Sequence, residues 1–263
     1  MVSEWNIPQE LIDKIIDQLH ADRITLKACS IVSHSFLHPC RKHLFFSIDL
    51  SRVSSSQVHT LCNILKTQPG IGSLIRELYI YLGGDEMCDW IMEDSVLPNI
   101  LEMTPHLQMI SLNGRVHPSF IVWQFIPIRV QSAILIGLQS PNLTEVRINT
   151  VGVFPSSIFS SLSHVRRLRL KCTRFYTSKQ SPPPSPSTFN NLEALELHFS
   201  PRLKSIILPQ KLRLLAVNST DEVTLSNAQD VISSSASSIK AVILPRYSAG
   251  SSRKCHHLDG DKV

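Results

Sequence analysis

The chain has 263 residues, a formal net charge of +5 and a hydrophobic content of 43%, which is ordinary for a globular protein. This length can bury a large core, as one elongated domain or as two units. No run approaches the roughly 18 consecutive apolar residues of a membrane span, and the first residues lack the pattern of a secretory signal. The six cysteines are scattered without paired spacing, which is typical of a reducing compartment. We therefore expect a cytoplasmic or nuclear protein with no membrane segment.

Residues 7–46 predict a compact module of three helices. Pro8 suits the first turn of a helix, because no helical carbonyl would have received its missing N–H. Apolar residues then recur at helical spacing, at Leu11, Ile12, Ile15, Ile16 and Leu19. Asp22 can cap a second helix, and Pro39 is expected to start a short third helix that ends near Leu44. The first apolar stripe is wider than one small packing partner needs, which indicates a surface for another protein.

An ordered set of residues runs through this module: Ile7, Pro8, Glu10, Leu11, Ile15, Ile16, Leu19, Leu26, Ala28, Cys29, Val32, Ser33 and Phe36. The set resembles an F-box, of the divergent kind common in fungal proteins. The resemblance implies a three-helix module that docks on a Skp-family adaptor and so joins a cullin-based ubiquitin ligase. It also implies that Pro8, Leu11, Ile15, Val32 and Phe36 face the adaptor. The chain departs from the family at Phe36, where the family often has Trp.

A simpler interpretation of the same stripe stays open, because apolar residues at helical spacing usually belong to a protein's own core. The module would then pack only on the rest of its own chain. The protein would be an interaction scaffold that works independently of ubiquitination. The two interpretations differ in whether Leu11, Ile15 and Phe36 are exposed in the free chain.

Residues 47–245 repeat one phrase, apolar-x-x-apolar-x-apolar, after a first strand expected near Ile48. The phrase starts at Ile75, Leu107, Leu143, Val165, Leu192, Leu212 and Ile239, in steps of 20 to 36 residues. It resembles a degenerate leucine-rich repeat, whose period is about 20–29 residues. A related copy at Leu203 follows Leu192 too closely for a full coil, so we place it on the return side of one repeat.

The alternation within each phrase predicts a short strand with one buried face, and neighbouring units must stack to cover that face. The expected fold is therefore α/β: an F-box-like helical module over residues 1–46, then an irregular leucine-rich-repeat solenoid with a curved parallel sheet over 47–245. Residues 246–263 are expected to form a disordered tail. An ordinary α/β domain can carry the same alternating leucines, and this alternative stays open. The proline-rich stretch 181–186 is expected to be a loop, and the serine-rich stretch 233–238 a turn.

The residues that alternate with the buried positions should share the opposite face of the sheet. In chain order they are Glu77, Tyr79, Tyr81, Met109, Ser111, Asn113, Glu145, Arg147, Asn149, Arg167, Arg169, Lys171, Glu196, His198, Leu214, Ala216 and Asn218. The candidate target-binding residues are Tyr79 and Tyr81 with a basic row of Arg147, Arg167, Arg169 and Lys171. Guanidinium groups bind carboxylate or phosphate, so an acidic peptide or phosphopeptide could pair with this row. The alternative is a solvated strand face that only keeps the protein soluble.

Sites for chemistry are not indicated. The sequence contains neither a Gly-x-Ser-x-Gly elbow nor a phosphate-binding loop, and the acidic residues between 85 and 94 fall at the intervals of a solvated helix face. His34 and His38 stand four residues apart, as two metal ligands on one helix face would, but Pro39 interrupts that region. No Cys-x-x-Cys pair or acidic ligand accompanies these histidines, Cys40 and His43, so a metal site is not expected. Phe175 and Tyr176 follow the basic row, but a nucleic-acid surface would need more interleaved aromatic residues. We expect a non-catalytic adaptor, without cofactor or metal, that binds the Skp-family adaptor, through it a cullin, and an unknown protein target.

Overall fold

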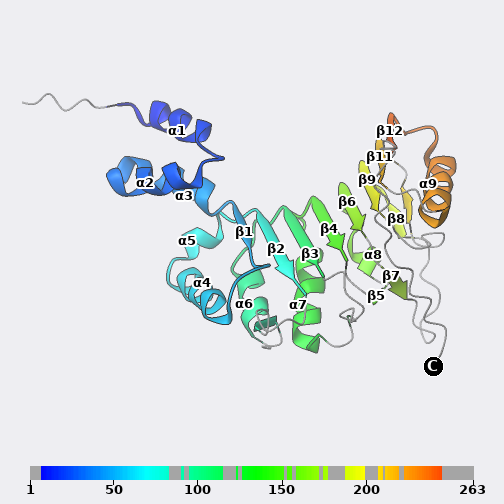
Figure 1. Ribbon diagram of the computed structural model, residues 1–263, viewed down its shortest axis with the longest axis horizontal. Helices are drawn as coiled ribbons and strands as arrows, with labels where there is room; N and C mark the ends of the chain where they lie inside the picture. Colours follow the sequence, from blue (N-terminus) through cyan, green and yellow to red (C-terminus); the bar gives the residue numbers. More distant parts are fainter. Residues whose placement is uncertain are drawn as a thin grey trace, which may run out of the picture.

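The computed structural model describes residues 7–82, 90–91, 95–114, 123, 126–150, 153–155, 158–171, 174–176, 187–198, 207–209, 211–218 and 222–244. Over these residues the protein is a mixed α/β structure, with helices beside one large parallel sheet that does not close on itself (Figure 1). The proline-rich stretch 181–186, the tail 246–263 and the acidic residues Asp85, Glu86, Asp89, Glu93 and Asp94 lie outside the described residues.

The three helices predicted at the start of the chain are present as α1 (Gln9–Gln18), α2 (Arg23–Val32) and α3 (His34–Leu44). Asp22 caps α2 as expected, because its Oδ1 accepts hydrogen bonds from the backbone N–H groups of Ile24 and Thr25, at 3.1 and 3.0 Å. A small apolar cluster of Ile12, Ile16, Leu26 and Cys40 joins the three helices. Leu19, Cys29, Phe36 and Leu44 pack against it, so the module has a core of its own.

The expected start of the third helix at Pro39 was wrong, because α3 begins at His34 and Pro39 lies inside it. A proline inside a helix cannot donate to the carbonyl four residues earlier, here that of Ser35. Gln9 Nε2 donates to this carbonyl oxygen at 3.0 Å. The amide of Gln9 thus replaces the hydrogen bond that Pro39 cannot make and links α1 to α3.

The large sheet contains a strand at each of the expected phrases. Its strands are β1 (Ser47–Asp49), β2 (Glu77–Tyr81), β3 (Met109–Asn113), β4 (Glu145–Asn149), β6 (Arg167–Lys171), β9 (Ala194–His198), β11 (Leu214–Val217) and β12 (Ala241–Ile243). They lie in the order of the chain, and every neighbouring pair is parallel. One apolar row crosses the sheet in register through Leu78, Ile110, Val146, Leu168, Leu195 and Leu215. All six are buried, so the predicted inward face is confirmed for these strands. It is wrong for the last phrase, because Val242, in register with Leu215 on the end strand β12, is 41% exposed.

Helices and two short sheets occupy the returns between these strands. The helices are α4 (Ser55–Thr67), α5 (Pro69–Gly72), α6 (Val96–Glu102), α7 (Ile128–Leu138), α8 (Ile158–Ser161) and α9 (Glu222–Ser235). In Figure 1, α4, α6 and α7 lie along the same side of the sheet. The short sheets pair β5 (Val153–Pro155) with β7 (Arg174–Tyr176) and β8 (Ser187–Phe189) with β10 (Ile207–Pro209). Leu208 lies in β10, outside the large sheet, as its close spacing predicted.

The main core is one continuous apolar cluster that extends from Leu50 to Val231, between the sheet and the elements on its covered side. It is separate from the small cluster of the helical module. The Trp123 and Phe154 rings contact each other at a tilt, with centroids 4.4 Å apart, and Phe159 meets Phe189 in an edge-on arrangement, so aromatic residues fill the wider returns. The opposite side of the sheet, which we call the open face, carries the remaining side chains of the strands.

Candidate functional site

The first candidate surface lies on the helical module. Its α1 stripe divides between two faces, because Ile12 and Ile16 are buried in the module whereas Leu11 and Ile15 are 50% and 52% exposed. Other large apolar residues of the module are also exposed, namely Ile7, Ile24, Ile31 and Val32. Isolated exposed apolar residues are common, but six of them on three short helices make the module a candidate contact surface. We call Ile7, Leu11, Ile15, Ile24, Ile31 and Val32 the module's apolar surface.

The five residues that the resemblance assigned to the adaptor are not equivalent. Pro8, Leu11, Ile15 and Val32 are exposed, whereas Phe36 is half-buried and packs against the module's own core. Phe36 therefore has an internal packing role and offers only part of its ring to a partner. The described residues of the sheet leave Leu11 and Ile15 uncovered, as the docking interpretation requires and the self-packing interpretation does not.

Polar contacts hold the module together without using its apolar surface. His43 Nε2 lies 2.7 Å from Asp17 Oδ1, and Lys42 Nζ lies 3.8 Å from the same oxygen. The hydrogen bond with His43 lowers the pKa of Asp17 below its usual value. Arg23 Nη2 donates to the carbonyl oxygen of Leu44 at 3.1 Å. These contacts connect α1 and the start of α2 to α3, so the three helices are fixed while the module's apolar surface stays available.

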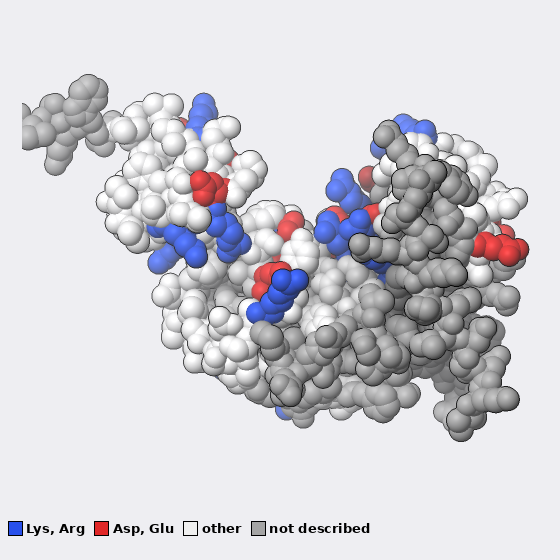
Figure 2. All heavy atoms as spheres, in the orientation of Figure 1, with Lys and Arg blue, Asp and Glu red and all other residues white. Residues whose placement is uncertain are grey.

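The second candidate surface is the open face. The expected outward residues share it, because Tyr79, Ser111, Arg147, Arg169, Glu196 and Ala216 form one row across the sheet and Tyr81, Asn113, Asn149, Lys171 and His198 form the next. Met109 and Ser111, which we expected to be exposed, are buried. Ser111 lies between the longer side chains of Tyr79 and Arg147 on neighbouring strands, which explains its burial. In Figure 2 the molecule is hollowed above the sheet, between the helical module and the C-terminal strands, and basic side chains gather there.

The basic row is partly neutralised by carboxylates of the same face. Arg147 Nε lies 2.6 Å from Glu145 Oε1, and Arg169 Nη2 lies 2.7 Å from Glu196 Oε1. Glu196 Oε1 also lies 2.7 Å from His198 Nε2 and accepts a hydrogen bond from Asn218 Nδ2 at 3.2 Å. Glu145 and Glu196 are thus partners of the row, whereas the sequence placed them at its borders.

Burial and hydrogen bonding to charged neighbours have opposite effects on the pKa values of Glu196 and Arg147 on this face. Burial alone would raise the pKa of Glu196, but the hydrogen bonds from Arg169 and His198 outweigh it and lower that pKa below its usual value. Burial would lower the pKa of Arg147, yet the hydrogen bond to Glu145 raises it. Burial, followed by the charge of Glu77, raises the pKa of Tyr79. Arg147 and Glu196 are therefore fixed in their charged forms, and Tyr79 in its neutral form, at neutral pH.

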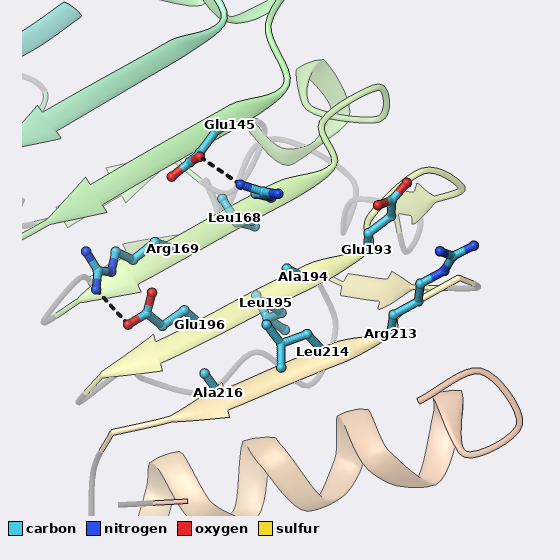
Figure 3. Close-up of a pocket in the computed structure, with 11 residues that line it drawn as sticks. Glu145, Leu168, Arg169, Glu193, Ala194, Leu195, Glu196, Arg213, Leu214 and Ala216 are labelled. Carbon is cyan, nitrogen blue, oxygen red and sulfur yellow. Dashed lines mark hydrogen bonds and ion pairs between the residues drawn. The ribbon is translucent and has the colours of Figure 1, made fainter. Parts of the chain in front are cut away.

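Arg167 differs from its paired neighbours. Its side chain is 72% exposed, and its closest ion-pair distance is 4.0 Å, from Nη1 to Glu145 Oε2. It borders a hollow of about 410 Å³ on the open face, shown in Figure 3. Glu193 and Arg213 lie at one end of this hollow, Arg169 and Glu196 at the other, and Ala194 and Leu214 between them.

Sequence reasoning missed Glu193 and Arg213, because both stand just before a strand and outside the alternating outward positions. Their position could have identified them from the sequence, because each stands immediately before the first residue of a strand, Ala194 or Leu214, that faces the open side of the sheet. Of the six predicted target-binding residues, only Arg167 and Arg169 line this hollow. Tyr79 and Tyr81 lie on β2, where Tyr79 is close enough to Arg147 for each to affect the pKa of the other.

Metal-ligand candidates do not converge. His34 and His38 are exposed on α3, whereas Cys40 points into the module's core, where burial raises the pKa of its thiol. Within the described residues, no group of three or more His, Cys, Asp or Glu side chains is placed to hold a metal ion.

Comparison with known proteins supplies no family for this chain. No family model matches it, and no curated protein matches it either. Among the helices that the structure describes, none has both the length and the apolar character needed to cross a bilayer.

Proposed function

We propose that the protein is a substrate-recognition adaptor of a Skp-cullin-F-box ubiquitin ligase. The helical module, as an F-box-like unit, binds a Skp-family adaptor and through it a cullin. The rest of the chain, as an irregular leucine-rich-repeat solenoid, presents a protein target on the open face. In this role the chain performs no chemistry itself. It acts by holding the target near the ubiquitin-carrying enzyme, which raises the effective concentration of the target at that enzyme.

The observation that carries this proposal is the exposure of Leu11 and Ile15 on a module that already has a core. Ile12 and Ile16 on the same helix fill that core, so Leu11 and Ile15 are not needed to assemble the three helices. Both are about half exposed. Burying the remaining half of each in an interface would stabilise a complex by about 1 kcal/mol per residue. Val32 and the other members of the module's apolar surface would add to this.

The open face supports the second half of the proposal. Strands arranged side by side in chain order give a continuous, hollowed surface (Figure 2), and extended surfaces of this kind suit protein targets. Its paired charges, Arg147 with Glu145 and Arg169 with Glu196, fix the side chains that a target would meet.

The test is co-expression of the full chain with a tagged Skp-family adaptor, followed by purification on the tag. We expect the natural chain to co-purify and the variant with Leu11→Asp and Ile15→Asp to be lost, because two charges would have to be buried in the interface. The matched control is Ile128→Asp with Ile136→Asp, which places two charges on exposed isoleucines of α7. This control should co-purify at full strength.

Circular dichroism of each variant shows whether the helices are retained. Full co-purification of the Leu11→Asp, Ile15→Asp variant would refute the docking surface. If the natural chain fails to co-purify, the alternative of a scaffold that works without ubiquitination is favoured.

A further inference from the structure

Four basic residues line up along one edge of the sheet, at or just before the starts of its last strands. Arg167 is the first residue of β6, and Arg166, Arg213 and Lys240 immediately precede β6, β11 and β12. Backbone hydrogen bonds connect Arg166, Glu193, Arg213 and Lys240 in sequence, each at 2.8 Å. Consecutive residues of this row are therefore separated by about one strand spacing, roughly 4.8 Å, and Glu193 stands between Arg166 and Arg213. We call Arg166, Arg167, Arg213 and Lys240 the basic edge.

The basic edge is not neutralised by the protein itself. All four side chains are exposed, and within the described part of the chain Arg166, Arg213 and Lys240 form no ion pair, while that of Arg167 is at 4.0 Å. Glu193, half-buried, is the one carboxylate in the row. Arg147 and Arg169, farther along the strands, already have glutamate partners at 2.6 and 2.7 Å. The cations available to a ligand are thus those of the basic edge.

An apolar hollow adjoins this edge. Ala194 stands in register between Arg167 and Leu214, and Ala216 stands in register beside Glu196. Two short side chains among long neighbours leave the hollow of about 410 Å³, whose floor includes Ala194, Leu214 and Ala216 (Figure 3). Ligand pockets of proteins measure about 300–1,000 Å³, so the hollow suits a small group such as one aliphatic side chain with its adjoining backbone.

We propose that the hollow and the basic edge together bind an acidic segment of a target protein, with one aliphatic side chain over Ala194, Leu214 and Ala216. Carboxylates on either side of that anchor pair with Arg167 and Arg213, which lie on opposite sides of the Ala194 position. This inference rests on the proposed function and names the class of target that the open face recognises.

Side-chain chemistry favours a protein ligand over a single-stranded nucleic acid. Nucleic-acid surfaces combine basic residues with aromatic rings on which bases stack. The residues that line the hollow include no aromatic side chain, and the floor is aliphatic. The exposed guanidinium groups of Arg167 and Arg213 are suited to bidentate pairing with carboxylates.

The experiment uses the immobilised full chain and a bead-displayed library of nonapeptides with Leu fixed at the centre and all other positions randomised. Retained beads are sequenced. We expect the natural chain to enrich Asp and Glu beside the central Leu, and the variant Arg167→Glu with Arg213→Glu to lose this enrichment. A single retained peptide measured by fluorescence anisotropy should bind that variant about tenfold or more weakly.

Two further variants separate recognition from misfolding. Glu193→Gln removes the one carboxylate of the row, so the retained acidic peptide should bind about two- to fivefold more tightly, a gain that a damaged fold cannot produce. Ala194→Phe fills the hollow with a residue that strands accept, and should abolish the preference for Leu over Gly at the centre. The matched control is Arg52→Glu with Arg129→Glu, two exposed arginines away from the hollow, which should leave selection unchanged.

The inference is overturned if the natural chain enriches no acidic residues, or if the Arg167→Glu, Arg213→Glu variant selects the same peptides. Enrichment of basic or aromatic residues would likewise overturn it. The same protein samples are tested for co-purification with the Skp-family adaptor. Loss of adaptor binding with intact peptide selection would count against the ligase role alone, and the reverse result against the acidic target alone.

Discussion

Arg169 on β6 and Glu196 on β9 form an ion pair between residues in direct register on neighbouring strands, with Arg169 Nη2 2.7 Å from Glu196 Oε1. The same oxygen contacts His198 Nε2 at 2.7 Å and accepts from Asn218 Nδ2 at 3.2 Å. One carboxylate thus connects β6, β9 and the residue that follows β11. This arrangement fixes the centre of the open face and leaves Arg167 as the exposed cation beside it.

We predict that Glu196 stabilises the protein at neutral pH and that this stabilisation is lost in acid. Its folded-state pKa lies below the unfolded value of about 4.3, so its ionised form stabilises the fold fully above that pH. This stabilisation is lost as the pH falls through the lowered pKa. The difference in unfolding free energy between the natural chain and Glu196→Gln, measured by urea denaturation, should therefore be largest near pH 6 and shrink below about pH 4. A difference that stays constant to pH 3 would contradict the assignment.

The two separate apolar clusters predict that damage to one will spare the other. Ile16 is fully buried in the module and Leu168 is 1% exposed in the main core. Replacing either with Ala should cost about 2–5 kcal/mol of the stability of its own cluster. In hydrogen exchange, Ile16→Ala should speed exchange in α1–α3 and leave β4 and β6 protected, whereas Leu168→Ala should do the reverse. Equal acceleration throughout the chain in both variants would show one cooperative core.

Two glycines of α5 give a matched pair for testing the packing of the first returns. A Cβ at Gly72 would clash with the backbone carbonyl of Met103, just after α6, whereas a Cβ at Gly70 would have nothing within 4 Å. We predict that Gly72→Ala lowers the unfolding free energy by about 1–3 kcal/mol, because the backbone must shift. Gly70→Ala should stay within about 0.5 kcal/mol of the natural chain. Thermal unfolding of the two variants provides the measurement, and equal effects would contradict the close approach of α5 to α6.

The strands could be predicted from sequence because their signal is local. Each phrase places its buried residues two positions apart, as Leu168 and Leu170 show, and this spacing holds whatever the neighbouring strand contains. The helix α9 was missed, and the turn expected at 233–238 was wrong at its start, because α9 continues to Ser235. In this helix the apolar residues Val223, Leu225 and Ile232 are exposed, whereas the polar residues Thr224 and Asn227 are buried. The spacing of its apolar residues therefore does not predict which face is buried.

The candidate sites depend on contacts that no local pattern contains. The pairing of Arg169 with Glu196 requires the register between β6 and β9, which are separated by a long return. Pro39 lies inside α3, where the side-chain amide of Gln9, 30 positions earlier, donates a hydrogen bond to the carbonyl oxygen of Ser35 that Pro39 cannot donate to. Phe36 is half-buried because three helices meet around it. Sequence therefore identified the residues of both surfaces better than their partners.

The strand order of the large sheet has a consequence for how the chain is made. Each strand of that sheet pairs with the strand of the sheet that precedes it along the polypeptide. The pairing partner of a newly made strand has therefore already been synthesised when that strand leaves the ribosome. Few contacts between strands require a segment that is translated much later. We therefore expect the sheet to fold strand by strand, from β1 toward β12, during synthesis. A premature stop after any strand would then yield a shorter, ordered fragment with an unpaired terminal strand, ready to pair with another polypeptide.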